Sequence, residues 1–315
     1  ALRIAASVIS FVFLIPYTAS VYNGLSRLFG MAFDIPYAVC VMAMAALTGV
    51  YVVLGGYMAT AINDFIQGIV MLFGIVAVIA AVLNGQGGFY EAVVQLSEIE
   101  SDVALTMGQK GVFASFFGPD LPNLIGVVIL TSLGTWGLPQ MVRKFYAIKD
   151  EKAIRYGTII STFFAIVVSG GCYFLGGFAR LFDSPAIYAA DGSVVYDSII
   201  PTMLASLSDI LIGIVIVLVL SASMSTLSSL VLTSSSTLTL DFIKGTLVKD
   251  MSEKKQLLVM RLLIVVFILI SVVLALIQYH SNVTFIAQLM GVSWGALAGA
   301  FLAPFLYGLY WKRAT

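Results

Sequence analysis

The sequence has few charged residues, and this shortage excludes a large class of proteins. Only 10% of its 315 residues are charged, whereas 60% are hydrophobic. A water-soluble globular domain needs a more polar surface, so the composition predicts a protein embedded in a lipid bilayer. Sixteen basic residues balance sixteen acidic ones, so the net charge gives no argument for a nucleic acid partner.

Residues that carry catalysis or bind transition metals are also scarce. The two cysteines, Cys40 and Cys172, lie in apolar segments without metal-ligand spacing, and we expect both to be ordinary packed residues. The single histidine, His280, follows a predicted helix end and is expected to be solvated. The sequence contains no Ser/His/Asp set, no paired intramembrane carboxylates and no phosphate-binding loop, so it does not support an enzyme.

Apolar runs long enough to cross a hydrocarbon core of about 30 Å recur along the chain. They predict eight spans, at residues 4–25, 35–54, 62–84, 121–142, 157–179, 206–239, 256–278 and 284–310. The two longest connections, 85–120 and 180–205, are acidic and rich in Gly, Pro and Asp, and the stretch GGFYEAVVQLSEIESD is expected to form a short surface helix. The sequence therefore predicts an all-α polytopic membrane protein.

The basic residues predict the orientation of these spans. Eight crossings place both ends of the chain on one side, and that side receives all sixteen basic residues except Arg27, Lys110 and Arg180. Because cytoplasmic loops carry an excess of Lys and Arg, we expect both ends to be cytoplasmic and the two long loops to face outward.

The fourth predicted span is interrupted near its middle, where Gly134, Gly137 and Pro139 follow one another closely. Proline cannot donate a backbone hydrogen bond and clashes with the preceding turn, so the helix is expected to kink or open there. Broken helices of this kind bind substrates and ions in secondary transporters. A proline kink with a purely structural role is the alternative.

The sixth predicted span carries hydroxyl groups on one face. Helical spacing places Ala222, Ser225, Thr226 and Ser229 along a stripe, with Ser228 beside Ser225. Neutral oxygens arranged in this way suit a hard, weakly held cation such as Na⁺.

Serine and threonine in membrane helices also have a structural use, because they bond back to their own backbone or allow close helix packing. This remains the alternative for the stripe, and it is the interpretation that we prefer for the hydroxyls of residues 234–239.

Asp64 is the only acid within the apolar stretches of the first three predicted spans. Ionisable groups in such positions are costly and are candidates for function. The alternative is an interfacial acid at a helix start, favoured by the helix dipole. Just before it, Gly55 and Gly56 are expected to form the turn between the second and third spans.

Two stretches together resemble the sodium/solute symporter family, whose members include proline, pantothenate, sialic acid and sugar carriers. The stretch VYVVLGGYMATAINDFIQG is similar to the family's Tyr, Gly-Gly and Asp-x-x-Gln pattern, and SASMSTLSSLVLTSSSTLTLDFIK is similar to its Ser/Thr-rich helix. The family's core has ten helices in two inverted repeats of five. The resemblance implies that residues 1–315 form a single transmembrane transporter domain matching core helices three to ten, with the first two helices missing from a fragment.

Carried over to this sequence, the resemblance implies two sodium sites. The main site uses the carbonyl of Ala222 and the hydroxyls of Ser225 and Thr226. A possible second site, which some relatives have, uses Ser225 again with Ser228, Ser229 and Asp64.

The resemblance also implies a substrate pocket with Tyr17, Thr131, Thr135 and Trp136 as candidate residues. Proline carriers have aromatic residues where this sequence has Thr131 and Thr135, so the pocket is expected to offer more hydroxyls. It would take a small amino acid such as proline, a monocarboxylate or a pantothenate-like solute.

These features predict Na⁺-coupled symport of a small organic solute across the cell (cytoplasmic) membrane by alternating access, with Na⁺ as the coupling ion. The alternative is the membrane sensor domain of a signalling protein built on the same fold. The sequence leaves the oligomeric state open.

Overall fold

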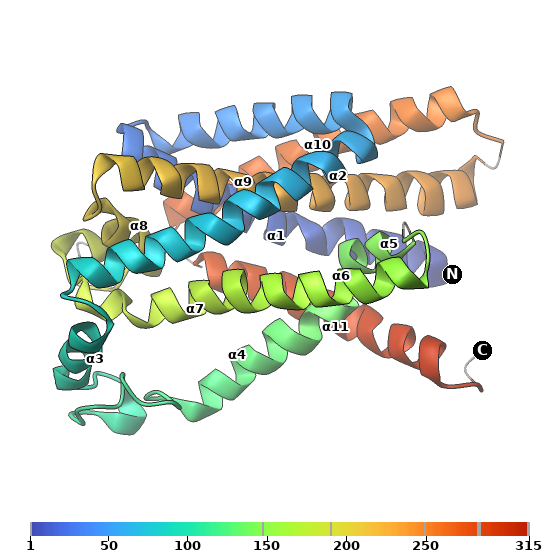
Figure 1. Cartoon of the computed structure of the whole chain (residues 1–315). Coiled ribbons are helices and arrows are strands. Elements are labelled where there is room, and N and C mark those ends of the chain that lie inside the picture. Colours follow the sequence, from blue (N-terminus) through green and yellow to red (C-terminus); the bar gives the residue numbers. More distant parts are fainter. Residues whose placement is uncertain (1, 147, 190, 249, 282–284, 314–315) are drawn as a thin grey trace. The chain divides into compact units, whose positions relative to one another are not determined.

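The computed structural model describes residues 2–146, 148–189, 191–248, 250–281 and 285–313, with only the backbone described at residues 56, 57, 59 and 143. Every regular element within these ranges is a helix, and the bridge between Tyr188 and Val194 is isolated. The prediction of an all-α protein is confirmed (Figure 1).

Helices in this structure fall into α-helical elements and shorter 3-10 or π segments. The α-helices are α1 (Leu2–Phe33), α2 (Tyr37–Gly85), α3 (Phe89–Glu98), α4 (Leu121–Leu133), α5 (Pro139–Phe145), α6 (Glu151–Phe164), α7 (Gly170–Gly177), α8 (Tyr196–Ala205), α9 (Asp209–Thr237), α10 (Glu253–Ser281) and α11 (Ile286–Tyr310). The 3-10 segments are η1 (Ala104–Thr106), η2 (Gly134–Gly137), η4 (Ala179–Leu181) and η5 (Pro185–Ile187), and the π segments are η3 (Ala165–Ser169) and η6 (Leu238–Leu247).

The described helices account for the predicted spans. Seven segments are long and apolar enough to cross a membrane: Leu2–Phe33, Tyr37–Gly55, Thr60–Gly85, Glu151–Leu181, Asp209–Leu247, Glu253–Ser281 and Ile286–Tyr310. A shorter apolar segment, Leu121–Gly137, covers the remaining predicted span. The predicted start of the last span, residue 284, lies outside the described residues.

The predicted surface helix in the first long loop is α3. The second long loop contains α8, for which no helix was predicted, and its Met203 and Leu204 are buried. Its Pro and Asp residues suggested a loop, whereas burial of these two side chains supplies the stabilisation that the local sequence lacks.

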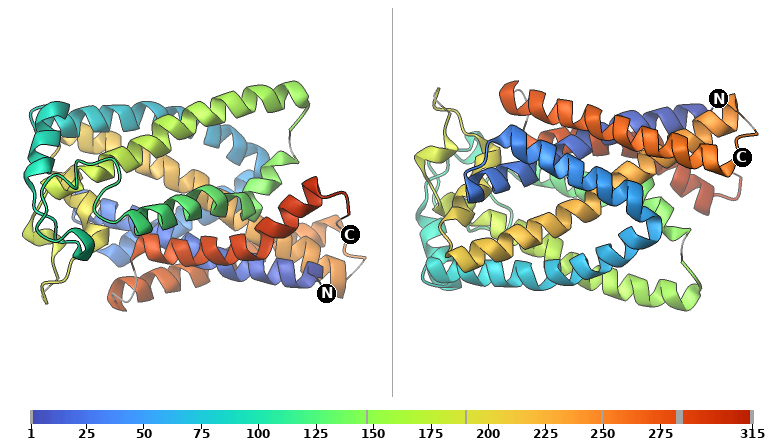
Figure 2. Two further views of the ribbon diagram at one scale, coloured as in Figure 1. Left: turned by 90° about the horizontal axis from the view of Figure 1, so that it is seen from below. Right: turned by 90° about the horizontal axis from the view of Figure 1, so that it is seen from above.

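α2 is a single run of helix that covers two predicted spans. Its 49 residues would measure about 74 Å if straight, more than twice the thickness of a hydrocarbon core. Figures 1 and 2 show the ribbon bending sharply between its two apolar parts, Tyr37–Gly55 and Thr60–Gly85. The turn expected at Gly55 and Gly56 is therefore made without leaving helical backbone. The side chain of residue 56 lies outside the described residues.

The predicted break in the fourth span is present. α4 ends at Leu133, the 3-10 turn η2 follows, and Leu138 adopts extended backbone with φ −76° and ψ 122° before Pro139 starts α5. The Leu138 N–H donates to the carbonyl of Thr135 at 3.2 Å. Because Pro139 lies at the first turn of α5, its missing N–H costs no helical hydrogen bond.

The described chain divides into two compact units, and each is described by itself. The first comprises residues 1–66, 130–148 and 222–315, and the second comprises residues 67–129 and 149–221. The assignment of residues 1–315 to a single transporter domain stays a prediction.

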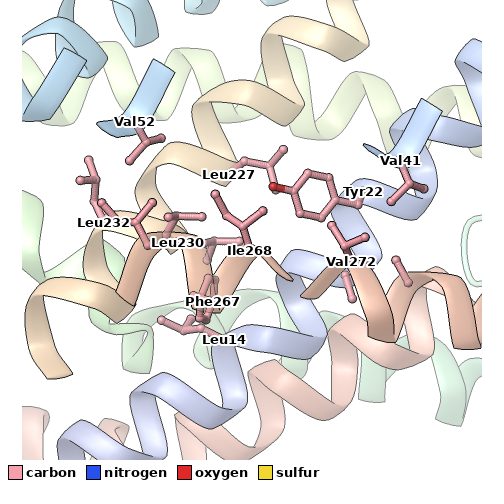
Figure 3. Packing of buried hydrophobic residues seen from close by; sticks show 14 of the residues in the cluster. Leu14, Tyr22, Val41, Val52, Leu227, Leu230, Leu232, Phe267, Ile268 and Val272 are labelled. Carbon is pink, nitrogen blue, oxygen red and sulfur yellow. The ribbon is translucent and has the colours of Figure 1, made fainter. Parts of the chain in front are cut away.

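The first unit is organised around α1, which lies beside α10 and α11 (Figure 2). Its core gathers buried side chains from these helices and from α9, including Leu14, Leu227, Leu230, Phe267 and Ile268 (Figure 3). Since lipid is as apolar as these side chains, close van der Waals packing rather than exclusion of water stabilises the cluster.

α1 also contains a proline, Pro16, inside its apolar stretch. A proline removes one helical hydrogen bond and disturbs the carbonyls of the preceding turn. The hydroxyl of Ser293 in α11 donates to the carbonyl of Phe13, so a neighbouring helix supplies a partner for that turn. The carbonyl that loses its helical donor is that of Val12, so this bond supports the neighbouring carbonyl of the same turn.

The second unit packs the later part of α2 against α7 through a glycine. A Cβ on Gly171 would lie 3.0 Å from Ile75 and 3.1 Å from Ile79, so the absence of a side chain permits the close approach. Near this helix end, Arg180 pairs with Asp102 at 2.9 Å. The hydrogen bond from the guanidinium holds the pKa of the Asp102 carboxyl below its usual value.

The two cysteines differ in environment. Cys40 is buried, as expected, whereas Cys172 is exposed on α7 and does not pack inside the described structure. In a membrane helix an exposed apolar side chain faces lipid without cost, so apolarity alone did not predict burial. His280 is exposed at the end of α10, in agreement with the prediction.

The glycine at the helix break generates a prediction about stability. A Cβ at Gly137 would lie 2.8 Å from the Cα of Ala298 and 3.2 Å from the backbone N of Leu302, so α11 would have to move. We expect Gly137→Ala to destabilise the protein by about 1–3 kcal/mol, seen as a lower melting temperature in detergent.

Gly126→Ala is the control, because a Cβ there meets nothing within 4 Å and alanine favours the helix. Equal melting temperatures for the two variants would contradict the packing of the break on α11.

Candidate functional site

The hydroxyl-rich face of α9 brings three oxygens together. Ser225 Oγ donates to the carbonyl of Ala222 at 3.1 Å, and Thr226 Oγ1 donates to the same carbonyl at 2.9 Å. Leu227 and Leu230 on the same helix are fully buried in the first unit's core, so they hold the helix in place, while the three oxygen-bearing residues are only partly buried.

This arrangement leaves the hydroxyl oxygens able to bind a cation. Each hydroxyl hydrogen is directed at the helix backbone, so the lone pairs on Ser225 Oγ and Thr226 Oγ1 point away from it. Neutral hydroxyl and carbonyl oxygens are ligands that hard cations accept. The donor set of Ala222, Ser225 and Thr226 therefore fits Na⁺ chemically, and it also satisfies the structural role of back-bonding.

One turn further along α9, the same pattern repeats. Ser228 Oγ donates to the carbonyl of Ser225 at 3.1 Å. Ser225 thus takes part in both groups, with its hydroxyl in the first and its carbonyl in the second. Successive turns of a helix are about 5.4 Å apart, so the two candidate sites are neighbours along one helix.

A cavity of about 240 Å³ lies beside this second group. Three elements of the first unit line it: the part of α2 just after the bend, α5 and α9. The lining residues are Thr60, Ala61, Asp64, Gln140, Lys144, Ser228, Ser229, Leu232 and Thr233. Three of the four residues predicted for the second sodium site, Asp64, Ser228 and Ser229, therefore share one cavity. The fourth, Ser225, does not line it and contributes its carbonyl to Ser228 instead.

Asp64 is only partly paired in this cavity. Its Oδ2 lies 3.8 Å from Lys144 Nζ, and its side chain is 23% exposed. Its Oδ1 is buried and has no hydrogen-bond partner among the described residues. A carboxylate held in this way carries unsatisfied acceptor capacity, and this makes it attractive to a further cation.

Lys144 and Gln140 also line this cavity, and neither was among the predicted site residues. Both follow the break on α5 and are four residues apart, so they lie on one face of that helix. This spacing was visible in the sequence, but nothing local indicated that the face would meet Asp64.

The candidate substrate residues fall into two groups. Tyr17 packs edge-on against Trp294 of α11, with ring centroids 5.5 Å apart. Thr135, within the break, donates to the carbonyls of Ser132 at 3.0 Å and Thr131 at 3.3 Å. Trp136 is 55% exposed.

Two cavities meet at Trp136. One, of about 440 Å³, is lined by Ser10, Trp136, Gly137, Pro139, Val142, Tyr146, Thr233, Ser236, Thr237, Leu240, Asp241, Phe301, Pro304 and Phe305. The other, of about 540 Å³, includes Thr135 and Trp136. Tyr17 and Thr131 line neither of these two cavities.

α11 connects the two groups of candidates. Trp294 contacts Tyr17, and Ala298, four residues on, lies where a Cβ on Gly137 would collide. Residues four apart share a helix face, so one stripe of α11 supports both α1 near Tyr17 and the helix break.

Hydroxyls closer to the end of α9 behave as structural groups. Ser235 and Thr239 are fully buried and donate to the carbonyls of Val231 and Ser235, each at 2.7 Å. This agrees with the packed role expected for residues 234–239. Beyond them, Asp241 in η6 accepts from the Arg3 guanidinium at 2.8 and 2.9 Å.

Comparison with known proteins gives a consistent result. A family model described as "Sodium:solute symporter family" matches residues 1–315. The chain is 26% identical over 295 residues to the sodium/pantothenate symporter of Haemophilus influenzae, covering 93% of this chain and 58% of that protein. It is 28% identical over 320 residues to the sodium/proline symporter of Salmonella typhimurium, covering 100% of this chain and 60% of that protein. The chain thus spans less than two thirds of the length of these relatives.

A solved structure shares the fold. It is described as the substrate-bound outward-open state of a Na⁺-coupled sialic acid symporter, and it matches 99% of this chain and 64% of its own with a TM-score of 0.75 at 19% identity. This likeness concerns the fold alone.

The oxygen cluster on α9 generates a prediction about cation binding. In the full-length protein, Thr226→Val keeps the side-chain shape but removes one proposed ligand oxygen. We expect it to raise by about tenfold the Na⁺ concentration that gives half-maximal thermal stabilisation, measured against choline at constant ionic strength.

Thr239→Val is the matched control, because Thr239 makes the same type of back-bond in η6, the π segment that directly follows α9. An identical sodium dependence in the two variants would argue that Thr226 is purely structural.

Proposed function

Because the chain belongs to the sodium:solute symporter family, we propose that it forms the greater part of a protein that couples Na⁺ entry to uptake of a small organic solute. The observation that supports this most directly is the convergence of the Ser225 and Thr226 hydroxyls on the Ala222 carbonyl. These three oxygens form the main sodium site. The cavity with Asp64, Ser228 and Ser229 forms a second site.

The transport mechanism is alternating access. Sodium binds from outside and stabilises the outward-open state, the solute follows, and a rearrangement opens the sites to the cytoplasm. The element suited to move is the break around Leu138, because its extended backbone joins two short helical segments. Orientation follows the distribution of basic residues, with both ends of the chain cytoplasmic.

The number of sodium sites determines how strongly the solute is concentrated. One charge moved through 100 mV releases about 2.3 kcal/mol, which corresponds to about fifty-fold accumulation. Two charges correspond to more than about a thousandfold under the same potential. A second site at Asp64 would therefore raise the ratio of internal to external solute concentration that the transporter can maintain.

The solute is a small carboxylate-bearing molecule, such as proline, a monocarboxylate or a pantothenate-like compound. Relatives that match 93% and 100% of this chain are named as a pantothenate and a proline symporter, respectively. The cavity beside the break, about 440 Å³ in volume, has the size of a small-molecule site. Its lining combines Trp136 and Phe301 with the hydroxyls of Ser10 and Thr233, a composition that accommodates a compact solute with polar groups.

Uptake into proteoliposomes tests the proposal. With the full-length protein and an inward Na⁺ gradient, we expect accumulation of labelled proline, pantothenate or a related carboxylate, and none when choline replaces Na⁺. Sodium-dependent binding of a solute without uptake or counterflow would contradict symport and favour the sensor interpretation.

Asp64 tests the second site. We expect Asp64→Asn to lower the Hill coefficient for Na⁺ in uptake from above one toward one, because the amide no longer offsets the charge of a second cation. Asp102→Asn is the control, since this acid is paired with Arg180 at 2.9 Å and lines neither the cavity at Asp64 nor the cavity beside the break. A coefficient above one that Asp64→Asn leaves unchanged would remove the second site.

A further inference from the structure

We propose that Lys144 is a tethered cation that neutralises Asp64 when the second sodium site is empty and leaves the carboxylate when Na⁺ binds. The inference rests on the proposed function, because it concerns the same cavity. It assigns a role to a residue outside the predicted sodium ligands, and that role links ion binding to the segment that follows the helix break.

The geometry places the lysine within reach of the acid without a tight bond between them. Nζ lies 3.8 Å from Oδ2 of Asp64, longer than a hydrogen bond. Oδ1 of Asp64 has no hydrogen-bond partner among the described residues. The pair is thus close enough to neutralise charge and loose enough to separate.

The Lys144 side chain is exposed enough to move away from Asp64. It is 54% exposed, whereas the Asp64 side chain is 23% exposed. A lysine has a flexible four-carbon stem and a strongly hydrated head, so the ammonium can separate from Asp64 and extend toward a hydrated surface. The aspartate stays in the cavity and keeps its neutral neighbours.

The single carboxylate in the cavity favours one cation at a time, either the Lys144 ammonium or Na⁺. Asp64 and Lys144 are the charged residues among those that line it, and the remaining lining is neutral, with hydroxyls from Thr60, Ser228 and Ser229. With the ammonium in place the cavity is neutral. Sodium added beside it would give two cations and one carboxylate at short range, which their mutual repulsion disfavours. Sodium and the ammonium therefore exchange.

The lysine belongs to the segment that alternating access is proposed to move. α5 is a seven-residue helix that starts at Pro139, directly after the extended Leu138. Gln140 and Lys144 are four residues apart on α5 and both line the cavity. Displacing the ammonium therefore removes an attraction between α5 and α2. By linkage, movement of α5 away from α2 would favour sodium binding at Asp64 to the same degree.

The test is a sodium titration of the full-length protein in detergent, with melting temperature as the readout and choline chloride keeping the ionic strength constant. Lys144→Gln removes the competing charge, and we expect it to lower the half-saturating Na⁺ concentration by about threefold to tenfold. Lys144→Met provides a second uncharged variant. Lys144→Arg keeps a cation, and its half-saturating concentration should stay within about twofold of the unsubstituted protein.

A double-variant cycle distinguishes competition between Lys144 and Na⁺ from a purely structural role of the lysine. In the Asp64→Asn background, we expect Lys144→Gln to have no further effect on the sodium titration, because the competition needs the carboxylate. Lys254→Gln, an exposed lysine in the first turn of α10, controls for a general change in surface charge.

The outcomes separate this inference from the proposed function. If sodium stabilises the unsubstituted protein and Lys144→Gln has the same or a weaker sodium affinity, the tethered cation is wrong while the sodium sites stand. If sodium does not stabilise the unsubstituted protein more than choline does, the proposed function fails and the inference with it.

Discussion

Backbone polar groups inside a bilayer must find partners within the protein, and the described chain meets this constraint by forming helices. A serine or threonine hydroxyl at the same depth needs an acceptor too, and the helix carbonyls supply it. On α9 the hydroxyls of Ser225, Thr226 and Ser228 donate to carbonyls of their own helix. Beside Pro16, a hydroxyl from α11 donates to the carbonyl of Phe13. Because each hydroxyl hydrogen is bonded to a carbonyl, the oxygen lone pairs of these side chains stay available to a cation.

The helix break follows from the same constraint. A chain can leave helical geometry at membrane depth only where protein surrounds it. Gly137 permits this by bringing its backbone against Ala298 and Leu302, and the buried Leu138 then carries the chain into α5. The break is therefore held by α11, whose neighbouring turn also supports Tyr17 through Trp294. A movement of the segment after the break would therefore change the packing of this face of α11.

α5 connects the break with the charged cavity. Lys144 lies on this helix and faces Asp64, so the position of the short helix and the charge around the carboxylate depend on each other. The Lys144–Asp64 pair therefore couples the proposed second sodium site to α5 and the break, the element proposed to move. The main site, one turn earlier on α9, has no such charged partner among its three oxygens and depends on neutral ligands.

The sequence by itself determined the features that arise within one segment. The eight apolar spans, the break before Pro139, the helix at 89–98 and the hydroxyl stripe of α9 were predictable, because each depends on local composition or on the backbone chemistry of one residue. It did not predict α8 or the exposure of Cys172. Tertiary structure alone decided that Lys144 and Gln140 share a cavity with Asp64 and Ser228. Those residues come from three helices far apart in the chain, and only packing decides which helix faces meet.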